Sequence, residues 1–171
     1  MGFANCILAL LLLRRARPYA QGMRIALYQP DIAGNVGTIL RLAACLGVGV
    51  DLIEPMGFAW GDRALSRAGM DYAGTVEVIR HVDWAAFESA TTARIVLLTT
   101  RGGTRLDTAA FHADDVLLLG SEGSGVPPDV HARADMAVRI PLVPGFRSLN
   151  VAVAAGIALA EALRQTAGWP E

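Results

Sequence analysis

The sequence has few cysteines and no long hydrophobic run. Its two cysteines, Cys6 and Cys45, stand in no C-x-x-C or Cys/His spacing, which argues against a disulfide scaffold and against structural zinc. No apolar run reaches the roughly 18 to 20 residues that a membrane-spanning helix needs. We therefore expect a cytoplasmic protein with no membrane segment and no metal.

Lysine is absent, and neither sign of charge dominates. All 15 basic residues are arginines, 16 residues are acidic, and the formal net charge is -1. This balance excludes a strongly basic coat for nucleic acid, so any nucleic-acid site must be a local patch. With 171 residues, 53% of them hydrophobic, the chain suits one globular domain.

The first 22 residues differ from the rest. Phe3 to Leu13 is almost continuously apolar, and three arginines follow it, which reverses the order of a secretory signal. Met23 then opens a strand-like segment directly. We interpret residues 1–22 as an N-terminal extension, either disordered or produced by a misassigned start, and residues 23–171 as a single domain.

Short β-branched or leucine-rich runs alternate with helix-like segments from residue 23 onward. This alternation is typical of an α/β domain with a mostly parallel sheet flanked by helices. We predict strands at Arg24–Tyr28, Val48–Ile53, Thr75–Ile79, Arg94–Thr99, Val116–Leu119 and Ala137–Ile140. We predict helices at Val36–Leu46, Arg63–Ala68, Asp83–Ser89, Pro128–Arg133 and Leu149–Thr166.

The ends of two helices are informative. Asn35 is predicted to cap the first helix and Gly47 to end it, while Cys45 is predicted to be a buried, inert thiol. The last helix is rich in alanine and becomes polar only near its end. We expect it to be buried against the sheet or against a second copy of the chain.

Familiar catalytic motifs are incomplete. The glycines of residues 120–125 have the spacing of a phosphate loop, but Val-Pro follows where Lys and Ser or Thr are needed. No G-x-S-x-G motif or metal-ligand spacing is present. The three histidines stand in polar sequence and are predicted to be ordinary surface residues: His81, His112 and His131.

Three polar, glycine-rich loops each follow a predicted strand of the C-terminal half. Loops at the carboxyl ends of parallel strands form the ligand crevice of open α/β sheets. Each loop alone is more often a plain turn, but three together favour a binding site. The loops are Thr99–Gly103, Gly120–Pro127 and Ile140–Asn150.

The chain resembles the SPOUT class of RNA methyltransferases, and within it the tRNA (cytidine/uridine-34-2′-O)-methyltransferase family. The resemblance covers Met23 to Gln165. Its motifs are Leu27-Tyr-Gln-Pro-Asp-Ile-Ala-Gly-Asn35-Val-Gly-Thr-Ile-Leu-Arg41-Leu, then Ile53–Trp60, Arg67–Tyr72 and the three loops. It implies a deep trefoil knot in the C-terminal half, which periodicity would not predict, because chains rarely thread through loops.

The resemblance also implies that S-adenosylmethionine binds within the knotted loops. The apolar side chains of Leu98, Ile140 and Leu142 are expected to sandwich the adenine. The implied cofactor-binding residues are Leu98, Gly120, Glu122, Ile140, Leu142, Ser148 and Leu149.

The implied reaction moves a methyl group from a sulfonium to a ribose 2′-hydroxyl. The implied catalytic residues are Arg41, Asn35, Ser148 and Asn150. A guanidinium stays protonated, so we do not expect Arg41 to act as the base. We expect it to bind a phosphate with two N–H groups and to stabilise the developing alkoxide. Ser148 and Asn150 open the last helix, where free N–H groups could hold an anionic oxygen.

The implied substrate is the wobble nucleotide, C34 or U34, in the anticodon stem-loop of tRNA. The implied assembly is a homodimer in which each site borrows residues from its partner, with Arg41, Arg139 and Arg147 gathered into one patch. Two alternatives stay open at this point. One is 2′-O-methylation of another RNA such as rRNA, and the other is a non-catalytic RNA-binding module.

Overall fold

A computed structural model describes residues 22–61 and 75–171, and these residues form an α/β fold. Seven strands make one sheet in the order β3-β2-β1-β6-β4-β7-β5, and every neighbouring pair is parallel. The strands are β1 (Arg24–Tyr28), β2 (Gly49–Ile53), β3 (Val78–His81), β4 (Ile95–Leu98), β5 (Thr104–Arg105), β6 (Val116–Leu119) and β7 (Met136–Arg139). The helices are α2 (Ala33–Leu46), α4 (Trp84–Ala90), α5 (Pro128–Arg133), α6 (Val151–Thr166) and the 3-10 turn η2 (Leu106–Thr108).

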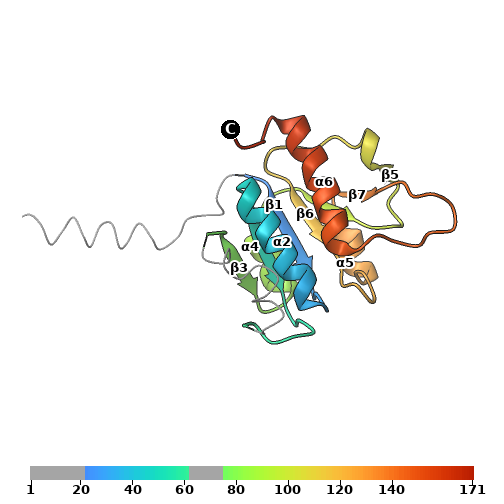
Figure 1. Cartoon of the computed structure of the whole chain (residues 1–171). Coiled ribbons are helices and arrows are strands. Elements are labelled where there is room, and N and C mark those ends of the chain that lie inside the picture. The colour runs from blue at the N-terminus through green and yellow to red at the C-terminus, as the bar shows by residue number, and fades with distance from the viewer. Residues whose placement is uncertain (1–21, 62–74) are drawn as a thin grey trace, which may run out of the picture.

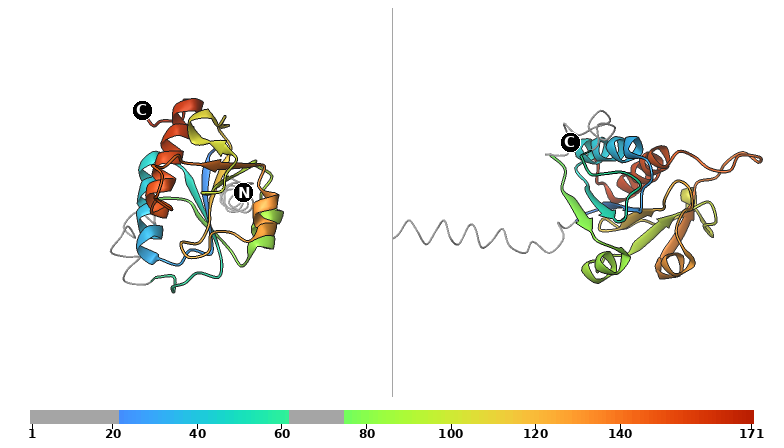
Figure 2. Two further views of the ribbon diagram at one scale, coloured as in Figure 1. Left: turned by 90° about the vertical axis from the view of Figure 1, so that its right-hand side faces the viewer. Right: turned by 90° about the horizontal axis from the view of Figure 1, so that it is seen from below.

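The helices cover both faces of the sheet. Helices α2 and α6 lie side by side on one face, and α4 and α5 lie on the other (Figures 1 and 2). The central strands are therefore buried on both sides, which explains why they read as continuous apolar runs and not as alternating ones. The predicted α/β architecture with a parallel sheet is confirmed.

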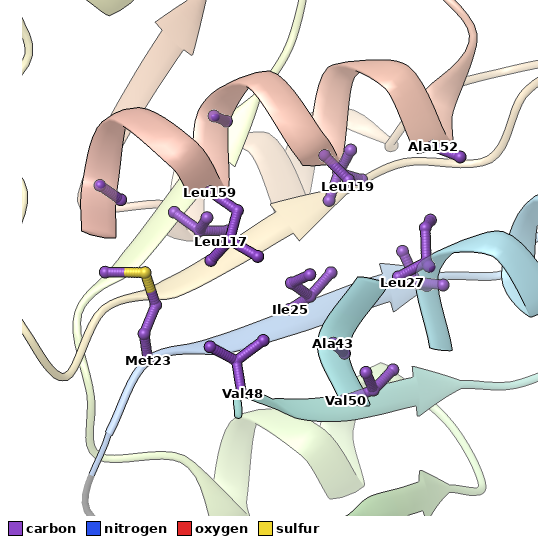
Figure 3. Close-up of a cluster of buried hydrophobic side chains, with 14 of the residues drawn as sticks. Met23, Ile25, Leu27, Ala43, Val48, Val50, Leu117, Leu119, Ala152 and Leu159 are labelled. Atoms are coloured by element: carbon purple, nitrogen blue, oxygen red, sulfur yellow. The ribbon is translucent and has the colours of Figure 1, made fainter. Parts of the chain in front are cut away.

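Alternate residues of β1 supply two separate cores. Ile25 and Leu27 pack with α2 and α6, beside Leu117 and Leu159 (Figure 3). Ala26 belongs to the second core, under α4 and α5. Because successive side chains of a strand point to opposite faces, one short segment ties both helical layers to the sheet.

The predicted strands are confirmed apart from shifts of one residue at the ends of β2, β4 and β7, and there are two larger differences. Strand β3 lies three residues later than the predicted start at Thr75, because its pairing to β2 sets His81 opposite Ile53. Strand β5 and the turn η2 were not predicted, since a strand of two residues carries no periodicity. The predicted helix Arg63–Ala68 lies outside the described residues, as does the Arg67–Tyr72 motif.

Helix α2 begins three residues earlier than predicted. Its N-cap is Ile32, which makes no side-chain capping bond, so the prediction that Asn35 caps this helix is wrong. The amide of Asn35 is instead bonded to Glu122 and Asn150. Gly47 ends the helix with a φ of 69°, as predicted. Cys45 is exposed on α2, so the prediction of a buried thiol is also wrong.

Helix α6 packs against α2 and the sheet and keeps one outward face. An added Cβ at Gly156 would lie 3.8 Å from Leu42 Cδ2, so the two helices contact closely at this glycine. Val153 and Ile157, one turn apart on the outward face, are 51% and 40% exposed. The helix is therefore buried against the sheet as expected, and its second apolar face is uncovered in the single chain.

A buried ionic cluster crosses the first three strands. Asp51, fully buried on β2, accepts from Arg24 Nε at 2.6 Å and lies 2.8 Å from His81 Nε2. A second arginine nitrogen donates to Glu77 at 2.6 Å. His81 is only 6% exposed and rests edge-on against Phe87, so the prediction of a surface histidine is wrong at this position. Polar residues near His81 in the sequence predict an exposed side chain, but the pairing of β3 with β2 buries it.

Among the described residues, no helix is long and apolar enough to cross a membrane. The trefoil knot that the resemblance implies stays a prediction.

Candidate functional site

Three loops meet at one edge of the sheet. Strands β6, β4 and β7 are neighbours and run parallel, so the loops that follow them leave from the same side. Together with the start of α2 they enclose a cavity of about 610 Å³. This volume falls within the range of roughly 300 to 1,000 Å³ that small-molecule sites occupy.

The walls of the cavity divide into apolar and polar parts. The apolar wall comes from the ends of the three strands and from the third loop. It consists mainly of Leu98, Leu119, Val126, Val138, Ile140 and Leu142. The polar part includes Asn35, Thr99, Arg101, Ser121, Glu122, His131, Ser148 and Asn150. A ligand here would have a flat apolar portion held between aliphatic side chains and a polar portion facing amides, hydroxyls and a carboxylate.

A chain of hydrogen bonds joins three distant segments beside the cavity. Asn35 Nδ2 donates to Glu122 Oε1 at 2.8 Å, and Asn150 Nδ2 donates to Asn35 Oδ1 at 2.9 Å. Asn150 Oδ1 in turn accepts from the backbone N–H groups of Ala152 and Val153 at 2.8 and 3.3 Å. The start of α2, the glycine loop and the start of α6 are therefore locked together at the polar end of the cavity.

The cap on α6 changes one expectation from the sequence. The N–H groups of Ala152 and Val153 are already bonded to Asn150. The prediction that the first N–H groups of this helix are free to hold an anionic oxygen is therefore wrong for these two groups. Asn150 acts on the site through its own amide, which reaches Asn35.

The glycine loop after β6 closes on itself. Ser121 and Gly125 exchange two backbone hydrogen bonds of 3.0 and 2.9 Å, and Gly125 has a φ of 70°. At Gly120, an added Cβ would lie 2.5 Å from the carbonyl carbon of Gly125. The backbone of one side of the loop therefore occupies the space where any larger residue at position 120 would put its side chain.

We expect Gly120→Ala to lower the free energy of unfolding by about 1 to 3 kcal/mol, because the methyl group forces the loop apart. Urea unfolding measures this loss. The matched control is Gly34→Ala in α2, where nothing lies within 4 Å of the added Cβ. That control is expected to be neutral or to stabilise by up to about 1 kcal/mol. Equal stability of the two variants would contradict the packing at Gly120.

Asp31 fastens the glycine loop to the segment before α2. Its carboxylate accepts from the Ser121 hydroxyl at 2.8 Å and from the Gly123 N–H at 3.1 Å. These two bonds, the hydroxyl bond first, lower the pKa of Asp31 below its ordinary value. The backbone N–H of Asp31 donates to Glu122 Oε2 at 2.8 Å, so the two acidic residues are held in fixed positions.

The bonds from Ser121 and Gly123 to the Asp31 carboxylate form a clamp on the glycine loop. The lowered pKa of Asp31 makes this clamp sensitive to acid. A carboxyl whose folded pKa is depressed contributes stability above its unfolded pKa and loses it as the pH falls through the folded pKa. We expect the clamp to be intact at neutral pH and to weaken only below about pH 4. In an NMR titration, Ser121→Ala should raise the pKa of Asp31, whereas the remote Ser89→Ala should leave it unchanged. An unmoved Asp31 pKa in the Ser121 variant would contradict the clamp.

A family model matches most of the chain. The model of the SpoU rRNA Methylase family matches residues 22–160. The chain belongs to the SpoU methylase family. Two relatives named tRNA (cytidine(34)-2′-O)-methyltransferase are from Beijerinckia indica and Escherichia coli K12. The first is 54% identical over 82% of this chain and 90% of its own length, and the second is 40% identical over 86% and 96%.

Solved structures agree with the fold of this SpoU methylase. A structure described as giving insight into the 2-OH methylation of C/U34 on tRNA superposes with a TM-score of 0.81. It is 42% identical in sequence, over 85% of this chain and 97% of that one. An rRNA methyltransferase from Sinorhizobium meliloti with bound AdoMet gives a TM-score of 0.78 at 29% identity, over 89% of this chain but 59% of that one.

Most of the predicted site residues lie together in this SpoU methylase. All seven predicted cofactor-binding residues line the cavity: Leu98, Gly120, Glu122, Ile140, Leu142, Ser148 and Leu149. Of the predicted catalytic residues, Asn35, Ser148 and Asn150 also line it. Arg41 is exposed on α2 and is not among the lining residues. It lies six residues after Asn35, which is about 9 Å further along the helix axis.

Some cavity residues carried no assigned role in the sequence. Arg101 belongs to the first predicted loop. Its place in the loop that follows β4 could have identified it as a candidate site residue. His131 is partly buried at the cavity wall and is not an ordinary surface histidine. Nothing in the local sequence signals this, because α5 reaches the cavity only through the packing of the sheet. Asp31 does not line the cavity, but it holds the glycine loop that does. It stood in the first motif, and its bond to Ser121 joins residues 90 positions apart.

One group of possible metal ligands lies outside the cavity. Among the described residues, His112, Asp114 and Asp115 bring ligand atoms within 4.8 Å of one another, a cluster that the sequence spacing did not predict. Asp115 is already bound by Arg94 Nε and Nη2 at 2.8 and 2.7 Å. An ion there would have to displace this buried pair.

Proposed function

We propose that the protein transfers a methyl group from S-adenosylmethionine to the 2′-hydroxyl of the wobble nucleotide, C34 or U34, of tRNA. The observation that carries this proposal is the single cavity that collects all seven predicted cofactor residues beside Asn35 and Asn150. Relatives at 40 to 54% identity carry the name of this activity. A cytoplasmic location follows from the proposed substrate.

The residues of the cavity fit the proposed methyl donor. The donor has a flat purine, a ribose and a charged amino-acid tail. Leu98, Ile140 and Leu142 provide aliphatic surfaces for the purine, and backbone groups at Gly120 can approach it closely, because no side chain intervenes. Glu122, Ser148 and Leu149 lie toward the polar end and suit the ribose and the tail.

The donor supplies an electrophilic methyl group, so the protein must align the acceptor and help remove one proton. The bonded Asn35, Glu122 and Asn150 form a rigid polar surface on which a ribose can be oriented. Arg41 binds a phosphate of the substrate with two N–H groups and stabilises the alkoxide that develops at the 2′-oxygen. The proton passes to water or to that phosphate, because a guanidinium has no lone pair to accept it.

We further propose that the site is completed by a second copy of the chain. Arg41 does not line the cavity of its own chain, although its proposed role requires it to reach the substrate. The outward face of α6 exposes Val153 and Ile157, and Trp169 near the C-terminus is 49% exposed. A two-fold contact through this apolar face would bury these side chains and bring an arginine of each copy toward the site of the other.

RNA binding is proposed to depend on a local cationic patch. Arginines drawn from Arg41, Arg139 and Arg147 of two copies would together contact a few phosphates, although the whole chain has a net charge of -1. Few phosphate contacts give a shallow dependence of affinity on salt.

Residues 1–22 are proposed to precede the folded domain, because β1 begins at Arg24, directly after Met23. N-terminal mass spectrometry of the native protein tests this. A peptide containing Phe3 to Leu13 would exclude a start at Met23.

The proposed function is tested by mapping ribose methylation in RNA from cells with and without the gene. We expect the 2′-O-methyl group at nucleotide 34 of some tRNAs to disappear when the gene is deleted. Intact methylation at nucleotide 34 together with a lost methyl group in rRNA would overturn the tRNA assignment. No change in any RNA would favour a non-catalytic binding module.

A further inference from the structure

The loop between β7 and α6 projects from the body of the molecule. It extends past the sheet and both helical layers in two perpendicular views (Figure 1 and the right panel of Figure 2). Two large apolar side chains in this loop are open to solvent: Phe146 is 74% exposed and Val143 is 69% exposed. Pro141 and Pro144 restrict the backbone beside them. Phe146 therefore lies in solvent on a loop that prolines stiffen, and its exposed ring is not part of a hydrophobic core.

This exposed ring stands next to the cavity. The same loop lines the cavity through Leu142, Ser148 and Leu149. Phe146 is two residues from Ser148, which limits the separation of their Cα atoms to about 7 Å. An RNA whose acceptor group lies at the polar end of the cavity is therefore within reach of the loop that carries Phe146.

The surroundings of the ring are cationic. Arg147 follows it directly, and Arg101 lines the cavity from the next loop. Within the described part of the chain, neither Arg101 nor Arg147 takes part in an ion pair. Four other arginines with exposed or half-exposed side chains are matched with carboxylates: Arg80 with Glu54, Arg105 with Asp107, Arg133 with Glu88 and Arg164 with Glu161. Arg101 and Arg147, without a carboxylate partner among the described residues, thus bring two cations beside the cavity, where they suit an anionic ligand.

We infer that Phe146 is a specificity residue that stacks on an unpaired base of the RNA, next to the methylated nucleotide, while Arg147 binds the adjoining phosphate. This inference rests on the proposed function. Proteins recognise single-stranded loops by stacking splayed bases on aromatic rings and by pairing arginines with the backbone. A second copy of the chain is the less suitable occupant, because a two-fold contact centred on this loop would set the arginines of one copy against those of the other.

The test compares four variants by the KM for an anticodon stem-loop RNA, the affinity for S-adenosylmethionine and the mass by sedimentation. We expect Phe146→Ala and Phe146→Leu to raise the KM for RNA about 5- to 100-fold, because both lack a stacking ring. Phe146→Trp should stay close to wild type. Val82→Ala removes a 77% exposed apolar side chain between β3 and α4 and should change nothing. In all four variants, kcat, cofactor affinity and mass should stay as in the wild type.

A direct readout of stacking is the fluorescence of 2-aminopurine placed beside the target nucleotide. The wild-type protein and Phe146→Trp should quench it more than Phe146→Leu does. An unchanged KM in Phe146→Ala, full activity in Phe146→Leu, or a change of mass or cofactor affinity would each overturn the inference while leaving the proposed function intact. Failure of the proposed function appears differently, as the absence of methyl transfer by the wild-type protein.

Discussion

Replacing Arg41 with alanine is expected to reduce methyl transfer to tRNA at least about 100-fold and to leave the affinity for S-adenosylmethionine unchanged. The reason is that the guanidinium acts on the substrate phosphate and the developing alkoxide, whereas the cavity residues hold the donor. Radioactive methyl transfer measures the first quantity and calorimetry measures the second. The control is Arg133→Ala, which removes an arginine that is paired with Glu88 away from the cavity. Normal turnover by the Arg41 variant would contradict the role assigned to Arg41.

The same variant tests whether two chains share one site. Ser148 lines the cavity, and Arg41 of the same chain does not. If Arg41 serves the other copy, a mixed dimer of Arg41→Ala and Ser148→Ala contains one site with both residues intact. Random mixing of two inactive variants should then restore about a quarter of wild-type activity. Mixtures as inactive as the separate variants would contradict a shared site.

Replacing Asp51 with alanine is expected to lower the free energy of unfolding by about 3 to 5 kcal/mol. The buried guanidinium of Arg24 then loses one of the two carboxylates that balance its charge and keeps Glu77. Arg24 is 2% exposed and Asp51 is fully buried, so water cannot replace the lost carboxylate. Urea or thermal unfolding measures the loss.

The matched control for Asp51 is Asp107→Ala. Asp107 also binds an arginine, Arg105, through two bonds of 2.9 Å, but both side chains are about half exposed. Exposed pairs contribute about 0 to 1 kcal/mol, so the control should be almost as stable as the wild type. Similar losses in the two variants would show that burial is not what makes the Asp51 cluster important.

The strands and the position of the site could be predicted from the sequence for a physical reason. Strands buried on both faces, such as β1 and β6, must be continuously apolar, and their predicted bounds are confirmed. Loops after parallel strands must leave from one edge, so the three glycine-rich loops had to lie close if their strands were neighbours. What the sequence did not contain is the order of the strands, which places β6, β4 and β7 side by side.

Two of the errors arise where a side chain has a tertiary partner that outweighs its local preference. Asn35 is a good helix cap by residue type, but its amide is bonded to Glu122 and Asn150, far away in the chain. His81 has polar neighbours in sequence, but strand pairing places it against Asp51. Such bonds between distant residues leave no periodic trace, and only the folded structure displays them.

The central claim is that this one cavity carries S-adenosylmethionine-dependent methylation of the wobble ribose. The most direct measurement incubates the purified protein with S-adenosylmethionine and tRNA, then locates new methyl groups by mass spectrometry of nuclease fragments. The account predicts one added 2′-O-methyl group at nucleotide 34, and none with Arg41→Ala. A wild-type protein that binds the donor but methylates no tRNA, or methylates another nucleotide, would contradict it.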